Sequence, residues 1–401
     1  ELMELSVSRR MLSDVPFGSY LGDGLDSGVI VASMSKFASE PVKTFSIGFE
    51  YDQGELSGSA KTAQLLGCDH TEIPFRASDV SNLPNIVYHM DDPLGDPISI
   101  PMFTLSKEAR RDVTVVLTGE GGDEIFGGSS IHKTMWFADL YRRKVPASVR
   151  NQFVMPLFAR MPASILNAAF QNPAYSGEKG KLKALNYLQM LEPDQIDQAY
   201  RYLISVYDVR DSESLYSASF QAQLRTMGAS NGSVDPPLNM PYLNRLLLLE
   251  FGHWLPDNML LRQDKIGMAH GIESRVPYLD HELVEFAMRL PQQLRLHNLT
   301  DKYILRSYAR KLLPGAVTQR KKTPFSVPAE KLIAQPEFQE MMSDLLSDSS
   351  TRKRGIFRVD TVAKLKKSIH ENDLVYMEQA YSLMVLELWF RIFVDRTWAG
   401  Y

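Results

Sequence analysis

The sequence predicts an α/β fold in which a parallel sheet is followed by a large helical part. Between residues 15 and 119, strand-like runs alternate with helix-like runs, which is the order of βαβ units. From about residue 135 to about residue 400 the strand signals fade, and helix-like runs are separated by turns that contain Pro and Gly. Because parallel sheets bind ligands at the carboxyl ends of their strands, functional residues are expected in the loops that follow the strands.

The individual elements are predicted from their apolar patterns. Strands are expected at residues 15–21, 42–49, 70–75 and 113–119, and helices at residues 26–38, 58–67 and 100–112. In the first helix, Ile30, Met34 and Phe37 are spaced to share one face. The run Val113–Gly119 is almost entirely apolar and β-branched, which is typical of a central strand covered on both faces. Residues 381–393 are apolar on nearly all sides and predict a buried helix.

Composition and charge narrow the functional classes. The chain has 401 residues, of which 44% are hydrophobic and 23% charged, as in ordinary globular enzymes. Its net charge of −4 argues against a nucleic-acid partner, since such binders are usually basic. The longest apolar stretch, Leu246–Leu255, is too short to span a membrane. The single cysteine, Cys68, excludes an internal disulfide and fits a cytoplasmic protein.

The first chemistry-bearing stretch is GDGLDSG, Gly22–Gly28, between the first strand and the first helix. Free N–H groups and the helix dipole make such a turn an anion site, and Ser27 can add a hydroxyl donor. Asp26 would repel a phosphate directly, but it could hold Mg²⁺ that bridges to one. The alternative is that Asp26 only caps the helix.

The second stretch is LTGEGGDEIFGG, Leu117–Gly128, after the apolar strand. It combines glycines with acids, and Glu120 and Asp123 lie three positions apart. This loop is expected at the same edge of the sheet as the first, and two acid-bearing glycine loops on one edge indicate a metal–polyphosphate site. The alternative is a solvated acidic turn.

Two later stretches carry further charge. Residues 261–287 contain charged side chains that could form a buried ion network or line a substrate pocket, with structural pairing favoured for most of them. They are Arg262, Asp264, Lys265, Glu273 and Arg275. Lys302 lies near the start of a helix predicted within Asp301–Pro314. A lysine there gains nothing from the helix dipole, so it predicts an anionic partner outside the helix.

Taken in order, these stretches resemble the synthetase domain of glutamine-hydrolysing asparagine synthetases, in the PP-loop group of ATP pyrophosphatases. The family's first loop reads Ser-Gly-Gly-Leu-Asp-Ser, and its second is close to TGEGGDEIFGG in this chain. TFSIGF, MAHGIESRVPYLDH, KYILR and RKKTPFSVP are also similar to family segments. The resemblance runs from about Leu5 to the last helix. It implies one synthetase domain over residues 1–401, with a PP-loop α/β core at about 1–132 and a mostly helical continuation at about 133–401 that completes the active site.

The resemblance also implies a reaction. ATP would be attacked by the carboxylate of aspartate to give β-aspartyl-AMP and pyrophosphate, and ammonia would then displace AMP to leave asparagine. Matching positions imply ATP binding at Leu21, Gly24, Asp26, Ser27, Ile47, Thr118 and Gly119, and Mg²⁺ at Asp26 and Asp123. They imply catalytic roles for Glu120, in forming the adenylate, and for Lys302, in stabilising charge. A homodimer is left open.

Two loop positions depart from the family pattern. Gly22 replaces a serine and deletes a hydroxyl donor. Asp23 replaces a glycine and puts a negative charge where the backbone should meet phosphate. Both changes leave open a degenerate, non-catalytic domain.

The acid that is amidated is also open. Related enzymes amidate sugars or peptides or close lactam rings, but the lactam-forming ones tend to carry tyrosine where this chain has Glu120. An RNA-thiolating PP-loop enzyme is disfavoured because those members need more cysteine. Whole family members begin with a glutaminase domain, which has no counterpart in these residues. The chain is therefore expected to be the C-terminal part of a longer protein and, alone, to use free ammonia.

Overall fold

The computed structural model describes residues 1–49, 54–162, 177–207, 209–227, 236–297, 300–320, 327, 329–369 and 374–397. The chain divides into two compact units. The first contains Glu1–Met90, Ile98–Lys133 and Glu250–Ser326, and the second contains Asp91–Pro97, Thr134–Leu249 and Val327–Tyr401. Each unit is considered by itself below.

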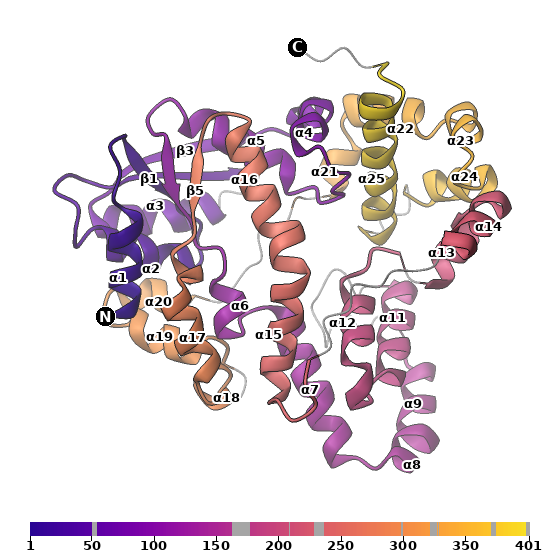
Figure 1. Cartoon of the computed structure of the whole chain (residues 1–401), viewed down its shortest axis with the longest axis horizontal. Coiled ribbons are helices and arrows are strands. Elements are labelled where there is room, and N and C mark those ends of the chain that lie inside the picture. Colours follow the sequence, from indigo (N-terminus) through magenta and orange to yellow (C-terminus); the bar gives the residue numbers. More distant parts are fainter. Residues whose placement is uncertain are drawn as a thin grey trace. The chain divides into compact units, whose positions relative to one another are not determined.

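The first unit is built on a five-stranded sheet with the strand order β3-β2-β1-β4-β5, and all neighbouring strands are parallel (Figure 1). The strands are β1 (Phe17–Tyr20), β2 (Lys43–Phe49), β3 (Asp69–Phe75), β4 (Val115–Leu117) and β5 (Glu273–Arg275). The predicted α/β class with a parallel sheet is confirmed. The strand β5 lies in a region predicted to be helical, so that part of the prediction is wrong.

Helices pack against the sheet in two layers. They are α2 (Leu25–Met34) and α3 (Gly54–Leu66) in one layer, and α4 (Leu83–Met90), α5 (Ser99–Ala109) and α16 (Leu261–Met268) in the other. In Figure 1, α2 lies on one side of the strands, and α5 and α16 lie on the other. The helix α2 is buried on nearly every side because it also contacts α1 (Leu2–Arg10), α19 (Tyr303–Ala309) and α20 (Gly315–Thr318).

One detail of α2 differs from its predicted apolar face. Ile30 and Met34 are fully buried, as expected, but Phe37 is 50% exposed. The helix ends at Met34, and the backbone N–H of Phe37 donates to the carbonyl of Met34 in the turn that follows. The helical spacing therefore stops before Phe37, and this side chain leaves the core.

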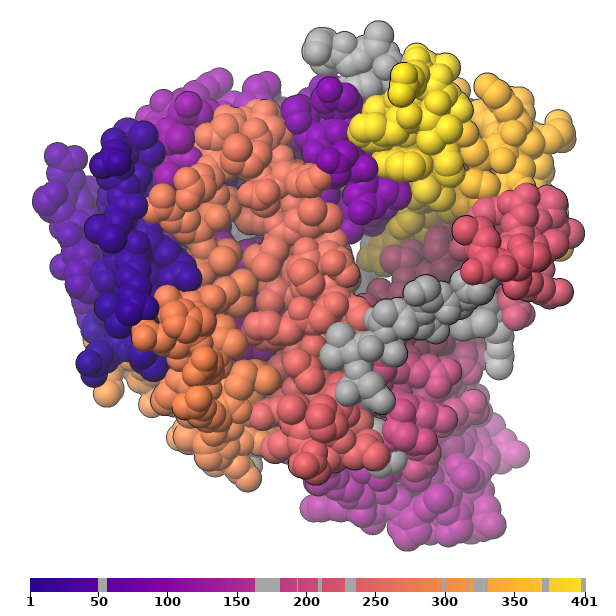
Figure 2. Space-filling view, viewed as in Figure 1, coloured from indigo at the N-terminus to yellow at the C-terminus, as the bar shows by residue number. Residues whose placement is uncertain are grey.

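The remaining elements of the first unit are short. They are η1 (Ala77–Asn82), α6 (Gly122–Phe126), η5 (Leu255–Leu260), η6 (Pro277–Leu279), α17 (His281–Arg289) and α18 (Gln292–Arg295). Figure 2 shows α1 on the surface of the unit, next to the chain around α17. Arg10 anchors α1 there through an ion pair of 2.8 Å with Asp280, the N-cap of α17.

The described elements of the second unit are helices. They are α8 (Ala147–Val149), η2 (Arg150–Val154), α9 (Met155–Arg160), α11 (Gly177–Gln189), η4 (Pro193–Gln195), α12 (Ile196–Ile204), α13 (Val209–Leu215), α14 (Ala218–Met227), α21 (Ala329–Ile333), α22 (Pro336–Leu345), α23 (Asp348–Arg354), α24 (Val359–Ser368), α25 (Leu374–Trp389) and η8 (Phe390–Val394). The chain passes between the units within α7 (Ser130–Lys144) and α15 (Tyr242–Gly252). Within the described part of the chain, we find no helix with both the length and the apolar character needed to cross a membrane.

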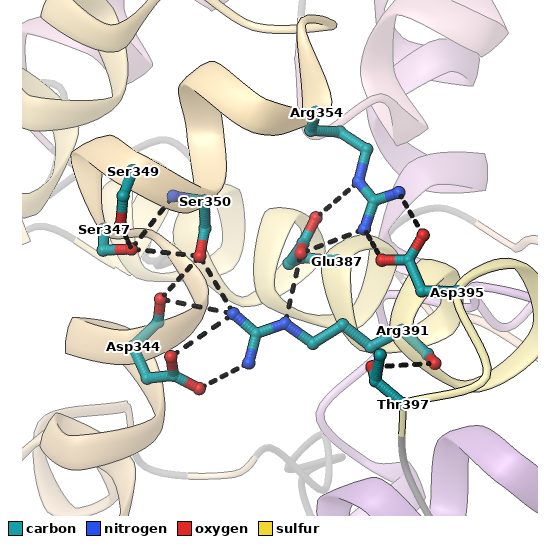
Figure 3. A network of polar contacts seen from close by, with 9 residues as sticks. All are labelled: Asp344, Ser347, Ser349, Ser350, Arg354, Glu387, Arg391, Asp395 and Thr397. Atoms are coloured by element: carbon teal, nitrogen blue, oxygen red, sulfur yellow. Dashed lines mark hydrogen bonds and ion pairs between the residues drawn. The ribbon is translucent and has the colours of Figure 1, made fainter.

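The predicted buried helix near the C-terminus is α25, in which Tyr381, Met384 and Val385 are buried. A polar network closes its C-terminal end (Figure 3). Arg354 donates to Glu387 at 2.9 Å and to Asp395 at 2.7 Å. It ties the end of α23 to α25 and to the residues that follow, so Arg354 has a structural role.

Candidate active site

The strand order places the two predicted loops side by side. The strands β1 and β4 are adjacent and parallel, and the Oγ of Ser19 donates to the carbonyl of Leu117 at 2.8 Å. From β1 the chain continues to β2 on one side of this pair, and β5 lies on the other side of β4. Such a reversal of strand order opens a crevice at the carboxyl ends of the strands, where α/β proteins bind ligands.

The two loops touch at Gly119. A Cβ on Gly119 would lie 3.0 Å from the backbone nitrogen of Ser27 and 3.1 Å from the Cβ of Asp26. A side chain at Gly119 would therefore push the loops apart. Gly121 has a φ of +88°, which favours glycine and turns the second loop into α6. The structure thus brings together the two glycine-rich stretches that the sequence predicts at one edge.

Lys302 joins the two loops. Its Nζ lies 2.5 Å from Oδ2 of Asp26 and 2.6 Å from Oδ1 of Asp123, and its side chain is 3% exposed. One small cationic group thus contacts a carboxylate from each loop. The alternative that Asp26 caps α2 is wrong, because the N-cap is Gly24 and the Asp26 carboxylate accepts from Lys302.

The charges around Lys302 keep it protonated. Burial opposes the charged form of the amine, but the charges and hydrogen bonds of Asp123 and Asp26 outweigh it. The pKa of Lys302 is therefore raised above its ordinary value of 10.5. Lys302 therefore carries a positive charge at neutral pH, and this charge lies between the carboxylates of Asp26 and Asp123.

The acids of the second loop are not a solvated turn. Burial raises the pKa of Glu120, Arg262 opposes this shift, and the charges of Asp123 and Asp26 reinforce it. Glu124 is 3% exposed, and burial together with the Asp123 charge raises its pKa well above the ordinary value of 4.5. The alternative of a solvated acidic turn is therefore wrong. Arg262, one of the charged residues noted in the sequence, contributes to the electrostatics of Glu120.

A second cluster holds the backbone at Lys302. Asp301 is buried, and it binds Nζ of Lys133 at 2.6 Å and Nη2 of Arg306 at 2.8 Å. Burial raises the pKa of the Asp301 carboxyl, but these hydrogen bonds outweigh it and hold the pKa below 3.8. Lys302 has a φ of +48° and precedes α19, a conformation that non-glycine residues rarely adopt. The cluster therefore stabilises the turn that aims Lys302 at the loops.

Two predicted nucleotide-contact residues are largely buried. Leu21 is 1% exposed at the end of β1, and its N–H donates to the carbonyl of Phe45 at 2.8 Å. Ile47 is 8% exposed on β2 and lies opposite Ile73 of β3. Both side chains pack in the framework under the loops, and their contact with ATP stays a prediction.

The other residues predicted to bind ATP present a polar group or an accessible backbone. The Oγ of Ser27 bonds the N–H and carbonyl of Gly22 at 3.2 Å each, which closes the first loop on itself. The Thr118 hydroxyl is buried and has no hydrogen-bond partner among the described residues. Apart from its chain neighbours, no atom of the described residues lies within 4 Å of the position that a Cβ would take on Gly24, so the backbone at the start of α2 is approachable.

Asp23, the departure from the family pattern, forms an ion pair with Arg320. The same Nη1 of Arg320 donates to the carbonyl of Gly58 at 3.0 Å and to the Oγ1 of Thr62 at 3.2 Å, both on α3. Arg320 begins the segment RKKTPFSVP, of which residues 321–326 and 328 lie outside the described residues. No local pattern in the sequence signals this pair, because its members are 297 positions apart.

The sequence did not predict two hydrogen bonds by which the segment around β5 holds the loops. The hydroxyl of Tyr278 donates to the carbonyl of Asp26 at 3.1 Å, and the carbonyl of Arg275 accepts from the N–H of Thr118 at 2.9 Å. Both lie in MAHGIESRVPYLDH, which the resemblance marked without assigning it a role. This segment holds the first loop and the second loop in place from one side.

The donor set fits Mg²⁺. The Oδ1 of Asp26 is buried without a hydrogen-bond partner among the described residues, and it lies 2.9 Å from the position of a Cβ on Gly122. Carboxylate oxygens are preferred Mg²⁺ ligands, and Mg²⁺ usually binds one or two carboxylates together with substrate phosphates. The described ranges contain no group of three His, Cys, Asp or Glu side chains around one point. The Oδ1 of Asp26 would therefore be available to such an ion.

The fold and the site define a class of protein. It is an α/β domain in which two glycine-rich loops, each carrying a carboxylate, meet at the point where the strand order reverses. Comparison with known families is more specific. Residues 1–391 match the asparagine synthase family, and the chain belongs to this family.

Two curated relatives show how far the similarity extends. Asparagine synthetase [glutamine-hydrolyzing] 1 of Bacillus subtilis (strain 168) is 30% identical over 394 residues, which cover 98% of this chain and 58% of that protein. Asparagine synthetase [glutamine-hydrolyzing] 3 of the same strain is 25% identical over 371 residues, which cover 88% of this chain and 51% of that protein. The chain thus spans little more than half the length of these relatives.

Proposed function

We propose that this chain is the synthetase part of an asparagine-forming ligase, which uses ATP to convert the side-chain carboxylate of aspartate to an amide. The observation that carries the proposal is the contact of the Lys302 ammonium with Asp26 and Asp123 where the two glycine-rich loops meet. Membership of the asparagine synthase family supports the substrate assignment. We also propose that residues 1–401 act as one synthetase domain, with an α/β core at about 1–132 and a mostly helical continuation at about 133–401.

In the first step, an oxygen of the aspartate side-chain carboxylate attacks the α-phosphorus of ATP. The bond from this phosphorus to the oxygen that bridges to the β-phosphorus breaks, and pyrophosphate leaves with that electron pair. The products are β-aspartyl-AMP and pyrophosphate. Negative charge grows on the leaving pyrophosphate, so positive charge and aimed N–H groups at the phosphates lower the barrier.

The chain offers these groups at the junction of the loops. The N-terminal turn of α2 presents backbone N–H groups and the positive end of the helix dipole. Lys302 supplies a buried ammonium that moves little on binding, because both carboxylates hold it. Asp26 and Asp123 would hold Mg²⁺, which would further neutralise the charge of the phosphates.

Glu120 is assigned to the adenylation step. Its carboxyl is half-buried near Asp26, Asp123 and Lys302, and its pKa is raised, so it lies in the field of the groups that handle the phosphates. We place it beside the reacting carboxylate of aspartate, where it orients the substrate and excludes water. Arg262 balances its charge.

In the second step, ammonia attacks the acyl carbon of the adenylate. The carbon–oxygen bond to AMP breaks, AMP leaves with that electron pair, and the attacking nitrogen releases a proton to solvent, so asparagine and AMP remain. The named relatives hydrolyse glutamine, which supports a glutaminase domain as the source of ammonia in the whole protein. Residues 1–401 alone are expected to use free ammonia.

The test is pyrophosphate release with ATP, Mg²⁺ and ammonium, measured with aspartate and with other carboxylic acids in turn. Release that depends on aspartate, with asparagine as the product, supports the proposal. Turnover with a different acid replaces the substrate assignment. Absence of pyrophosphate release with every acid, from protein that is folded, overturns the ligase. Asp123→Asn is the matched inactive variant, because it keeps the shape of the side chain and removes a carboxylate from the site.

A further inference from the structure

The first loop carries a carboxylate that its proposed role does not need. Asp23 precedes Gly24, the N-cap of α2, and stands where similar loops have glycine. A negative charge at this point repels the phosphates of ATP, and the repulsion is strong because the loop is partly withdrawn from water. A loop that binds phosphate through its backbone must therefore neutralise this side chain or turn it away.

The contacts of Asp23 show both effects. Its Oδ1 forms an ion pair with Nη1 of Arg320, and the two side chains are 32% and 20% exposed. The same nitrogen is fixed by the carbonyl of Gly58 at 3.0 Å and the hydroxyl of Thr62 at 3.2 Å. Arg320 is thus held on α3, and it draws the Asp23 carboxylate toward that helix.

Gly58 provides the space for this arrangement. A Cβ on Gly58 would overlap the carboxylate of Asp23. The carboxylate therefore rests on the backbone of α3, while within the described ranges no atom beyond the chain neighbours lies within 4 Å of the Cβ position on Gly24. The acid is packed to one side of the loop, and the backbone at the start of α2 stays open.

We propose that Arg320 is a positioning residue for the ATP-binding loop: with Gly58, it holds the Asp23 carboxylate against α3 and cancels its charge, so that the loop can receive the phosphates of ATP. The inference rests on the proposed function, because it takes ATP as the ligand of the loop. It adds a residue from a distant segment to the determinants of ATP affinity. It also accounts for an acid at a position where glycine is expected.

The test is a double-mutant cycle read by MgATP titration and by pyrophosphate release. Arg320→Met keeps the length of the side chain and removes its charge, and Asp23→Gly removes the acid. We expect Arg320→Met to raise the KM for ATP about tenfold or more, with kcat little changed, since a charged hydrogen-bonded partner is lost. Asp23→Gly is expected to match the wild type. The double variant is expected to recover the wild-type KM, because no charge is left to neutralise.

A second arm does not alter Arg320. Gly58→Ala displaces the Asp23 carboxylate, so it should raise the KM for ATP in the wild-type background and have little effect in Asp23→Gly. Arg320→Lys keeps the charge and should retain much of the affinity if Arg320→Met folds poorly. Arg310→Met removes an exposed arginine and serves as the control.

The outcomes separate this inference from the ligase. If the double variant binds ATP as weakly as Arg320→Met, Arg320 acts on the nucleotide or on the fold, and the proposed neutralisation is wrong. An unchanged KM in Arg320→Met overturns it as well. A wild type that binds MgATP but releases no pyrophosphate overturns the ligase alone, and the binding titrations still decide the role of Arg320. A wild type that binds no ATP overturns both.

Discussion

Replacing Lys302 with Met removes the ammonium group that contacts both loop carboxylates. The Lys302 side chain is 3% exposed, and Met keeps the length of its apolar stem, so the change is mainly one of charge. Removing one partner of a buried ion pair costs about 3–5 kcal/mol of stability. The side chains of Asp26 and Asp123 are 22% and 26% exposed, so water relieves part of this cost. We therefore expect the free energy of unfolding to fall by about 2–3 kcal/mol.

Lys302→Met is expected to lower the rate of the reaction more than it lowers stability. Losing one group that stabilises charge in the transition state typically costs about 2.7–4 kcal/mol, which corresponds to roughly a 100- to 1,000-fold fall in rate. We expect this fall in pyrophosphate release with ATP, Mg²⁺, aspartate and ammonium. Lys311→Met removes an exposed lysine near the end of the same segment and is the matched control. Urea unfolding of both variants separates the rate from the fraction of folded protein.

The pH dependence of the unfolding free energy tests the role of Lys302 independently. The pKa of Lys302 is raised in the folded state, so its contribution to stability is fully present below the ordinary value of 10.5 and is lost as the pH rises through the folded value. The difference in unfolding free energy between wild type and Lys302→Met should therefore be constant from neutral pH to pH 9 and shrink above about pH 10.5. Folded Lys302→Met that releases pyrophosphate within about threefold of the wild-type rate would refute the reasoning.

Three further predictions follow from the contacts. Asp301→Asn should slow pyrophosphate release more than it raises the KM for ATP. Because the pKa of Asp301 lies below 3.8 in the folded state, its contribution to stability is lost as the pH falls below about 4. Between pH 7 and pH 3, the free energy of unfolding in urea should therefore fall less in the variant than in the wild type. Gly119→Ala should weaken ATP binding by about 1–3 kcal/mol, measured by MgATP titration, because its Cβ would lie 3.0 Å from the backbone of Ser27. Arg354→Met should lower the free energy of unfolding by about 1.5–3 kcal/mol in urea, since Arg354 binds both Glu387 and Asp395.

The sequence predicts β4 because the burial of this strand shows in its composition. Val115–Leu117 is apolar at every position and is buried, so its pattern alone indicates a central strand. The strand β5 reads Glu-Ser-Arg, and its residues are exposed or half-buried at the edge of the sheet. A polar strand of this kind forms because β4 offers a free edge, and this tertiary reason leaves no periodic signal in the sequence.

The site divides in the same way. The two glycine-rich loops are recognisable because glycines and acids follow apolar runs, and this is a local pattern. The ion pairs that complete the site join Lys302 to Asp26 across 276 positions and Arg320 to Asp23 across 297 positions. Such pairs depend on the packing of α19 and α20 against α2, which no window of the sequence contains. Charge alone marks these residues as candidates, and the fold selects their partners.

The two acids of the first loop bear on the alternative of a degenerate, non-catalytic domain. Asp23 is the reason to expect weak nucleotide binding, and its ion pair with Arg320 cancels the charge that causes the repulsion. Asp26 shares Lys302 with Asp123 in a nearly buried cluster. Buried ion pairs contribute little net stability, and well-packed apolar residues often serve a fold better. Two carboxylates and a lysine, gathered from three segments at the end of a parallel sheet, give a domain kept only for assembly no physical advantage. In a domain that transfers adenylate, the same groups act on the phosphates.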